Sequence, residues 1–139
     1  MPQRRYYNPH LPQTLVIAQI LLYMNAVFGA LDVLQVSLDT RVSYSGVGKL
    51  ILIASVAAQV FGAYGVANER KVGYQIAVLA SFMPLIGRII SVIQVGASIS
   101  GNLRFILLGG SILNVLFEYA LIALLLHPMS ANHQKVWFR

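Results

Sequence analysis

Three charged side chains fall deep inside long apolar stretches of this 139-residue chain, away from the ends of the stretches: Asp32, Arg88 and Glu118. In a membrane, a mid-helix Arg or Asp costs about 2.5 to 3.5 kcal/mol. Side chains that carry this cost pair with one another or take part in moving protons and ions. Two carboxylates and one guanidinium in such surroundings therefore indicate an ion pair, a proton site, or both.

Four apolar stretches position these charges, over residues 14–38, 47–68, 72–95 and 105–126. At about 1.5 Å of rise per residue, each forms a helix long enough to cross a hydrocarbon layer about 30 Å thick. Hydrophobic residues make up 58% of the chain and charged residues only 10%, which favours a bilayer as the solvent. We therefore predict one all-α integral membrane domain. It is expected to be a four-helix up-down-up-down bundle with short loops, and residues 1–12 and 128–139 form interfacial or cytoplasmic tails.

Each stretch carries polar and small residues along one helical face. These residues are Ala18, Asn25, Asp32 and Asp39; Ser55, Gln59 and Gly62; Tyr74, Ala77, Ser81, Pro84, Arg88 and Ser91; and Arg104, Ser111, Asn114 and Glu118. Lipid tails are as apolar as leucine, so small and polar residues decide which faces pack inward. We expect the four faces to meet inside the bundle, where Asn25, Gln59 and Asn114 form interhelical hydrogen bonds. Glycines in the spans (Gly62, Gly65, Gly109 and Gly110) are interpreted as close helix contacts.

The depths of the charged residues predict which of them pair. With both termini on one side, Asp32 and Arg88 each lie roughly 24 to 27 Å from that side. We therefore predict an Asp32–Arg88 ion pair with a structural role. Glu118 lies about 12 Å from the same side, so it is predicted to lack a charged partner and to favour its protonated form. It is then a candidate for proton or cation handling; the alternatives are a neutral acid that donates one hydrogen bond and a pair with a neighbouring subunit.

Basic and aromatic residues gather at both ends of the chain. Arg4, Arg5, Tyr6 and Tyr7 precede the first stretch, and Trp137, Phe138 and Arg139 end the sequence; we interpret all seven as interfacial anchors. For the C-terminal segment, a mobile polar tail is the alternative. On one side Arg4, Arg5, Arg70, Lys71, Lys135 and Arg139 outnumber Arg41, Lys49 and Arg104 on the other. This asymmetry predicts a bacterial inner membrane protein with both termini in the cytoplasm, whose basic residues bind anionic lipid and not nucleic acid.

The chain has no cysteine, and His10, His127 and His133 all lie at or outside the ends of the stretches. We therefore predict no metal site, no haem and no catalytic residue, and expect that the protein is not an enzyme. The first functional hypothesis is an accessory subunit that binds larger membrane subunits and lipids.

The alternative is a small homo-oligomeric, proton-coupled transporter or ion conductor that uses Glu118 or the Asp32–Arg88 pair. In size and helix number the chain resembles the small multidrug-resistance exporters. Those proteins carry their essential carboxylate near the middle of the first helix, whereas Asp32 comes late in it. A third hypothesis is a lipid- or quinone-binding protein that uses the region from Pro84 to Arg88.

Overall fold

The computed structural model describes residues 3–38, 46–94, 96–108 and 112–139, and every regular element within them is helical. In chain order these elements are α1 (Gln13–Leu38), α2 (Gly46–Ala67), α3 (Lys71–Gln94), the short 3-10 helix η1 (Ser100–Asn102), α4 (Leu103–Leu108), α5 (Ile112–Leu126) and α6 (Pro128–Trp137). The all-α prediction is confirmed. Segments of α1, α2 and α3 are long and apolar enough to cross a membrane, as predicted for the first three stretches.

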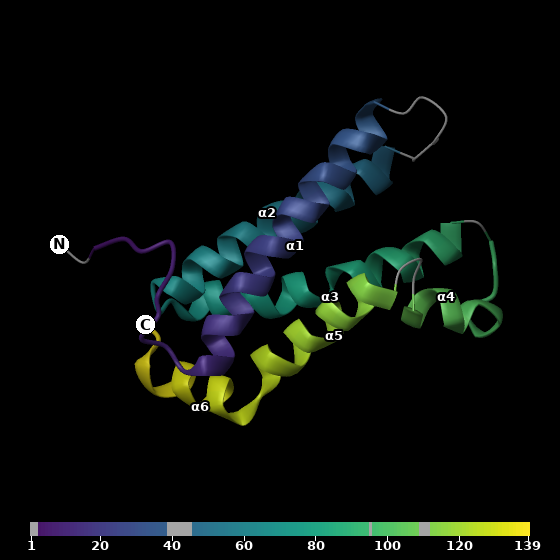
Figure 1. Cartoon of the computed structure of the whole chain (residues 1–139). Helices are drawn as coiled ribbons and strands as arrows, with labels where there is room; N and C mark the ends of the chain where they lie inside the picture. The colour runs from purple at the N-terminus through teal and green to yellow at the C-terminus, as the bar shows by residue number, and fades with distance from the viewer. Residues whose placement is uncertain (1–2, 39–45, 95, 109–111) are drawn as a thin grey trace.

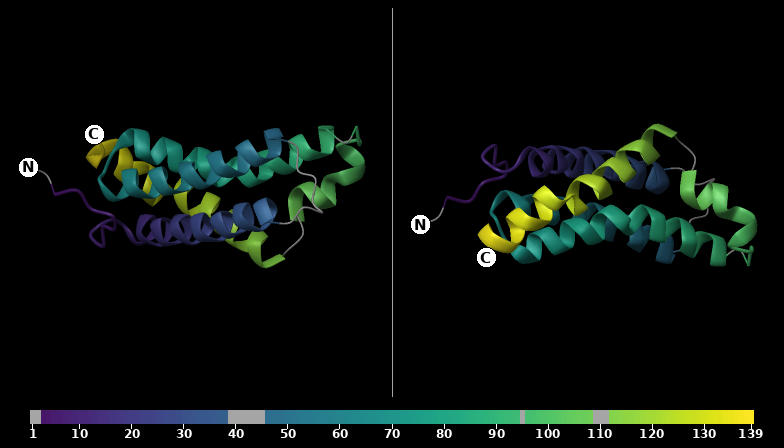
Figure 2. Two further views of the ribbon diagram at one scale, coloured as in Figure 1. Left: turned by 90° about the horizontal axis from the view of Figure 1, so that it is seen from above. Right: turned by 90° about the horizontal axis from the view of Figure 1, so that it is seen from below.

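The first three helices are sequential neighbours, and the chain then returns to the end of the molecule where it began (Figure 1). α2 packs against both α1 and α3, and α5 packs against α1 and α3. The N-terminal segment, the α2–α3 turn and α6 lie together at one end, which we call the terminal end (Figure 2). The opposite end, with η1 and α4, is called the far end.

Small residues bring α2 and α3 into close contact. A Cβ added at Gly65 would lie 2.3 Å from the Cα of Gly73, and one added at Gly62 would lie 2.7 Å from the Cα of Ala77. Any side chain at Gly65 would therefore push the two backbones apart. The prediction that Gly62 and Gly65 mark close helix contacts is confirmed, in keeping with the packing of small residues between membrane helices.

The turn between α2 and α3 begins with a Schellman motif at the end of α2. The Arg70 N–H donates to the Gly65 carbonyl at 2.9 Å, and the Glu69 N–H donates to the Val66 carbonyl at 3.0 Å. Glu69 has a φ of 55°, in the left-handed region where glycine is usual. The turn thus holds a non-glycine residue in an unfavourable conformation.

The predicted fourth helix over residues 105–126 is not confirmed as one continuous span. The structure has α4 and α5 on either side of residues 109–111, which lie outside the described residues together with the predicted contacts of Gly109 and Gly110. The Tyr119 hydroxyl donates to the Leu107 carbonyl at 2.8 Å. In one continuous helix these two residues would be about 18 Å apart along the axis, farther than a tyrosine side chain reaches.

In the described residues the return path is divided among α4, α5 and α6, and the four-helix up-down bundle is not confirmed. By length and composition alone, a fourth candidate span is counted when Val115–Leu126 and Pro128–Trp137, which are bent by 49°, are taken together. The C-terminal tail is itself a helix, α6, with Phe138 buried after it. This contradicts the alternative of a mobile polar tail.

Most of the core lies toward the terminal end, where α1, α2, α3 and α5 meet. Its fully buried members include Leu15, Leu22, Val66, Leu121 and Leu125. Small and polar residues of the predicted inward faces join them: Ala18, Gln59, Gly62, Tyr74, Ala77 and Ser81 are all buried. Large apolar residues such as Phe28, Leu31, Phe61 and Leu79 are exposed. For these residues the predicted arrangement, with small and polar groups inward and large apolar groups outward, is confirmed, whereas Ser91 and Arg104 are exposed.

Candidate functional site: a buried ion pair and a hydrogen-bonded cap

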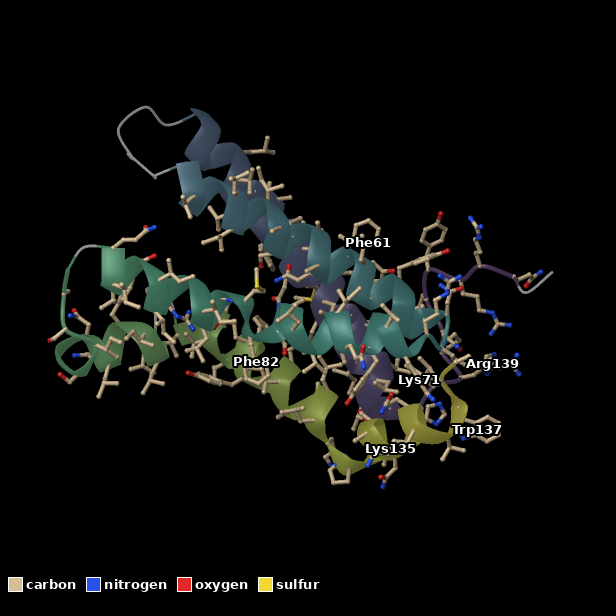
Figure 3. The ribbon with its side chains drawn as sticks, turned by 180° about the vertical axis from the view of Figure 1, so that it is seen from behind. Phe61, Lys71, Phe82, Lys135, Trp137 and Arg139 are labelled. Atoms are coloured by element: carbon tan, nitrogen blue, oxygen red, sulfur yellow. The ribbon has the colours of Figure 1, made fainter. Side chains whose placement is uncertain are left out.

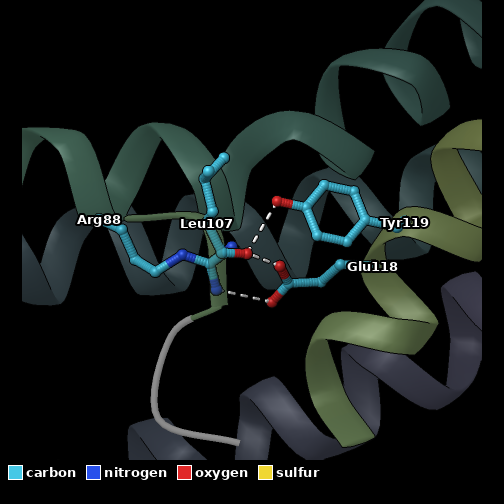
Figure 4. Close-up of polar contacts among 4 residues, drawn as sticks. All are labelled: Arg88, Leu107, Glu118 and Tyr119. Carbon is cyan, nitrogen blue, oxygen red and sulfur yellow. Dashed lines mark hydrogen bonds and ion pairs between the residues drawn. The ribbon is translucent and has the colours of Figure 1, made fainter. Parts of the chain in front are cut away.

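Arg88 of α3 and Glu118 of α5 form a two-point ion pair (Figure 4). Arg88 Nη2 donates to Glu118 Oε2 at 2.6 Å, and Nη1 donates to Oε1 at 3.2 Å. Each side chain is only 15% exposed. Parallel N–H to O bonds of this kind are among the strongest polar contacts in proteins and fix the relative orientation of both groups.

The prediction that Glu118 lacks a charged partner is wrong. Tyr74 of α3 and Leu125 of α5 lie at the same level, because the Tyr74 hydroxyl donates to the Leu125 carbonyl. Measured along each helix from that level, Arg88 lies about 21 Å away on α3 and Glu118 about 10 Å away on α5. Helical side chains lean toward the N-terminus of their own helix. Because α3 and α5 are antiparallel, Arg88 and Glu118 lean toward each other and close a separation that backbone depth alone overestimates.

Arg88 is thus paired with a different carboxylate from the one predicted. Asp32 belongs to α1, but its side chain lies outside the described residues, as does the side chain of Asn114 in α5. Asn25 is half-buried in α1 and Gln59 is buried in α2. Within the described residues, Gln59 Oε1 and Arg88 Nε are buried without a hydrogen-bond partner.

The ion pair lies where the return path is broken. Tyr119, the residue after Glu118, bonds to Leu107 of α4, so one turn of α5 contacts both α3 and α4. Figure 4 shows Arg88, Glu118, Tyr119 and Leu107 grouped together. The ion pair connects α5 to α3, and the Tyr119–Leu107 hydrogen bond connects α5 to α4. Both charged groups bond to each other in this arrangement. It presents the carboxylate to the guanidinium rather than to a free ligand.

A second polar group, at the terminal end, was not predicted. The N-terminal segment is fixed by Asn8, which is 2% exposed. Its backbone N–H donates to Gln19 Oε1 at 3.1 Å, and its side-chain Nδ2 donates to the Ala67 carbonyl at 3.2 Å and to Glu69 Oε1 at 3.3 Å. Asn8 therefore connects the N-terminal segment to α1 and to the α2–α3 turn at once.

Further hydrogen bonds hold the same segment on the turn. The Arg5 N–H donates to Asn68 Oδ1 at 2.9 Å, while Asn68 Nδ2 donates to the Arg5 carbonyl at 2.7 Å. The Tyr23 hydroxyl donates to the Tyr6 carbonyl at 2.7 Å. These bonds pair backbone groups of an irregular segment that would otherwise need water.

The C-terminal residues complete this group, which we call the terminal cap (residues 5–10, 67–71 and 127–139). The Arg139 N–H donates to the Glu69 carbonyl and the Lys71 N–H donates to the Arg139 backbone oxygen, both at 2.9 Å. Phe138 is 3% exposed and meets the Tyr74 ring edge-on. The prediction that Phe138 is an interfacial anchor is therefore wrong, because this ring belongs to the protein core.

The start of α6 is anchored to the start of α1. His127 caps the helix, since its Nδ1 accepts from the Met129 N–H at 3.2 Å. The buried hydroxyl of Ser130 lies 2.7 Å from the Thr14 hydroxyl and donates to the Leu124 carbonyl at 2.6 Å. A polar tail sequence thus becomes a docked helix in which the side chains of His127 and Ser130 find partners at helix ends.

The other predicted anchors are placed as expected at the surface. Arg4, Arg5, Tyr6, Tyr7, Trp137 and Arg139 are all exposed. Figure 3 shows Lys71, Lys135, Trp137 and Arg139 at the same end of the molecule. Asn8, Gln19 and Glu69 were not predicted; the sequence shows only an asparagine before the first apolar stretch and a glutamine inside it, with no indication of their partners.

Comparison with protein-family models, curated proteins and solved structures finds no match for this chain. Its class therefore follows from the fold and the site. Three helices, or four if the bent pair forms one span, are long and apolar enough to cross a membrane, which is compatible with an integral membrane protein.

Proposed function

We propose that this chain is a non-catalytic integral membrane protein, an accessory subunit that packs against larger subunits of a membrane complex. The observation that carries the proposal is the Arg88–Glu118 pair. Both groups are largely buried and bond to each other through two contacts. Buried polar groups that satisfy each other orient helices without requiring a substrate.

The exposed surface of the helices supports the same proposal. α1 exposes Phe28, Leu31 and Leu34, and α2 exposes Leu50 and Phe61. These large apolar side chains suit a hydrocarbon surface, supplied by acyl chains or by helices of a larger subunit. A small protein of this kind has most of its surface available for packing in a complex.

The distribution of basic residues supports an orientation. Arg4, Arg5, Arg70, Lys71, Lys135 and Arg139 are exposed at the terminal end, and Arg104 is exposed at the far end. Lys and Arg favour the cytoplasmic side of bacterial membranes. We therefore place the terminal end, with both chain termini, on the cytoplasmic face of the inner membrane.

The test is purification of the tagged chain from its native membranes in a mild detergent, followed by native electrophoresis and mass spectrometry. The proposal expects co-migration with larger membrane subunits at a fixed stoichiometry across preparations. Phe61→Ser, which makes an exposed position on α2 polar, should weaken that association if α2 faces the complex, and Leu31→Ser tests α1 in the same way. A free monomer or homodimer in every preparation contradicts the proposal.

The same protein distinguishes the alternative of a small proton-coupled transporter. Proton-coupled flux is measured in reconstituted vesicles. Flux that is lost in Glu118→Gln but retained in Asn114→Ala would support the transporter and contradict the accessory-subunit proposal. Elution volume and helical content of each variant are measured first, because removal of one partner of a buried pair also destabilises the fold.

A further inference from the structure

α6 has one face docked in the protein and another that is open. Ser130 is fully buried and Phe138, directly after the helix, is 3% exposed. About 100° to 120° around the helix from Ser130, Met129 is 50% exposed and Val136 is 75% exposed. These two residues are seven apart, so they lie on one side of the helix with about 20° of drift.

The contacts of α6 show that it runs across the end of the bundle. Near its start, Ser130 contacts Thr14 in the first turn of α1. Just past its end, Arg139 bonds to Glu69 and Lys71 at the start of α3. Because the first turns of α1 and α3 both lie at the terminal end, α6 passes from one to the other there, and its axis is bent by 49° from that of α5.

The charge around this helix is strongly positive. Lys135 and Arg139 are exposed on or beside α6, and Arg70 and Lys71 are exposed on the adjoining turn. The acidic residue described in the terminal cap, Glu69, is half-buried and accepts a hydrogen bond from Asn8. Aromatic groups that favour membrane interfaces are exposed at the same end: Trp137 is 63% exposed and Tyr6 is 76% exposed.

We propose that α6 lies in the headgroup layer of an anionic leaflet, with Met129, Val136 and Trp137 in the acyl boundary and Lys135 and Arg139 on lipid phosphates. An amphipathic helix in this position buries its apolar face about 5 to 10 Å into the interface. Each Lys or Arg near an anionic surface adds an attraction that corresponds to about fivefold in affinity. The inference goes beyond the proposed function, since it holds whether or not the protein has larger partners.

The single tryptophan of the chain, Trp137, is a built-in probe of this position. The full chain is reconstituted in vesicles that contain phospholipids brominated either near the headgroup end or near the methyl end of the acyl chain. The proposal expects stronger quenching of Trp137 fluorescence by the shallow bromines than by the deep ones. Stronger quenching by the deep bromines shows that α6 continues the α5 span and overturns the proposal. Quenching by aqueous iodide alone, with no effect of either lipid, overturns it too.

Lipid charge is tested with the same signal. Shallow-brominated phosphatidylglycerol and shallow-brominated phosphatidylcholine are each added at equal low fraction to unbrominated phosphatidylcholine vesicles. The proposal expects greater quenching by the anionic lipid, and loss of that excess in the Lys135→Gln, Arg139→Gln double variant. These side chains are exposed, and Arg139 contributes its backbone to the cap, so the fold is retained.

The matched control is Arg104→Gln, which removes one exposed positive charge at the far end. It should leave the excess quenching by anionic lipid unchanged. Equal quenching by the two lipids in the unmodified protein overturns the headgroup assignment. Equal loss in Arg104→Gln and in the double variant also overturns it, because the effect then reflects net charge and not contacts of α6.

Discussion

Arg88 and Glu118, which are 30 residues apart in sequence, bond side by side between α3 and α5 through two N–H to O contacts. Removal of one partner leaves a largely buried charge without its counter-charge, which typically costs about 3 to 5 kcal/mol. We expect Glu118→Gln and Arg88→Met each to lower the free energy of unfolding in detergent by several kcal/mol. The double variant Arg88→Met, Glu118→Met should recover most of this loss, because no isolated charge remains. Additive losses in a double-mutant cycle would show that the two groups are not coupled.

The first three helices could be predicted from the sequence because each apolar stretch is long and its small residues repeat at helical spacing. The partner of Glu118 could not, because depth along a helix backbone does not include the reach of an arginine side chain. The separation of α4 from α5 could not be predicted either. Gly109 and Gly110 are poor helix formers in water, yet glycine is frequent in membrane helices, so their presence did not decide between a helix and a break.

The terminal cap shows a different limit. Asn8 bonds to Gln19 and Glu69, residues that are 11 and 61 positions away. Hydropathy and periodicity describe which face of a helix is polar, but they carry no information on which distant polar group meets it. The burial of Phe138 is not predictable for the same reason: an aromatic residue beside Trp137 and Arg139 has the composition of an interface, and only the tertiary fold turns it inward.

The contact between Gly65 and Gly73 predicts a large difference between two glycine substitutions. An added Cβ at Gly65 meets the backbone of α3, so Gly65→Ala should destabilise the protein by about 1 to 3 kcal/mol, as overpacking does. Gly87 has nothing within 4 Å of an added Cβ, so Gly87→Ala should be neutral or stabilising by up to about 1 kcal/mol. Thermal unfolding of both variants in one detergent checks this. Equal effects would mean that α2 and α3 do not pack closely at Gly65.

The left-handed conformation of Glu69 predicts an order of stability among its variants. Glu69→Ala removes the side-chain bond to Asn8 and keeps a Cβ at a φ of 55°. Glu69→Gly removes the same bond but also the steric cost of the left-handed conformation, about 1 to 2 kcal/mol. We therefore expect the glycine variant to be the more stable of the two by about 1 kcal/mol in chemical unfolding. An alanine variant that equals or exceeds it would contradict the left-handed turn.

Gln19 should be needed to hold the N-terminal segment. Gln19→Leu leaves the buried Asn8 N–H without an acceptor, which costs about 1 to 3 kcal/mol. Amide hydrogen exchange in residues 5–10 should become faster, because this segment then opens more often. Gln13→Leu is the control, since Gln13 is exposed in the first turn of the same helix. Exchange that speeds up equally in both variants would assign the effect to hydrophobicity and not to the cap.

The docking of α6 onto α1 predicts which side of the membrane each end of the chain occupies. Because Ser130 contacts Thr14, residues around α6 must lie on the same side as the start of α1, whereas η1 lies at the far end. The chain lacks cysteine, so single thiols can be introduced at exposed positions: Gln3→Cys, Ser100→Cys and Asn132→Cys. In intact cells a membrane-impermeant maleimide should label only the thiol at position 100, and after permeabilisation all three. If the chain crossed the membrane only three times, positions 100 and 132 would share a side, and both would react in intact cells. That result would contradict the contact between α6 and the first turn of α1. It would also show that the chain does not cross the membrane a fourth time after α3.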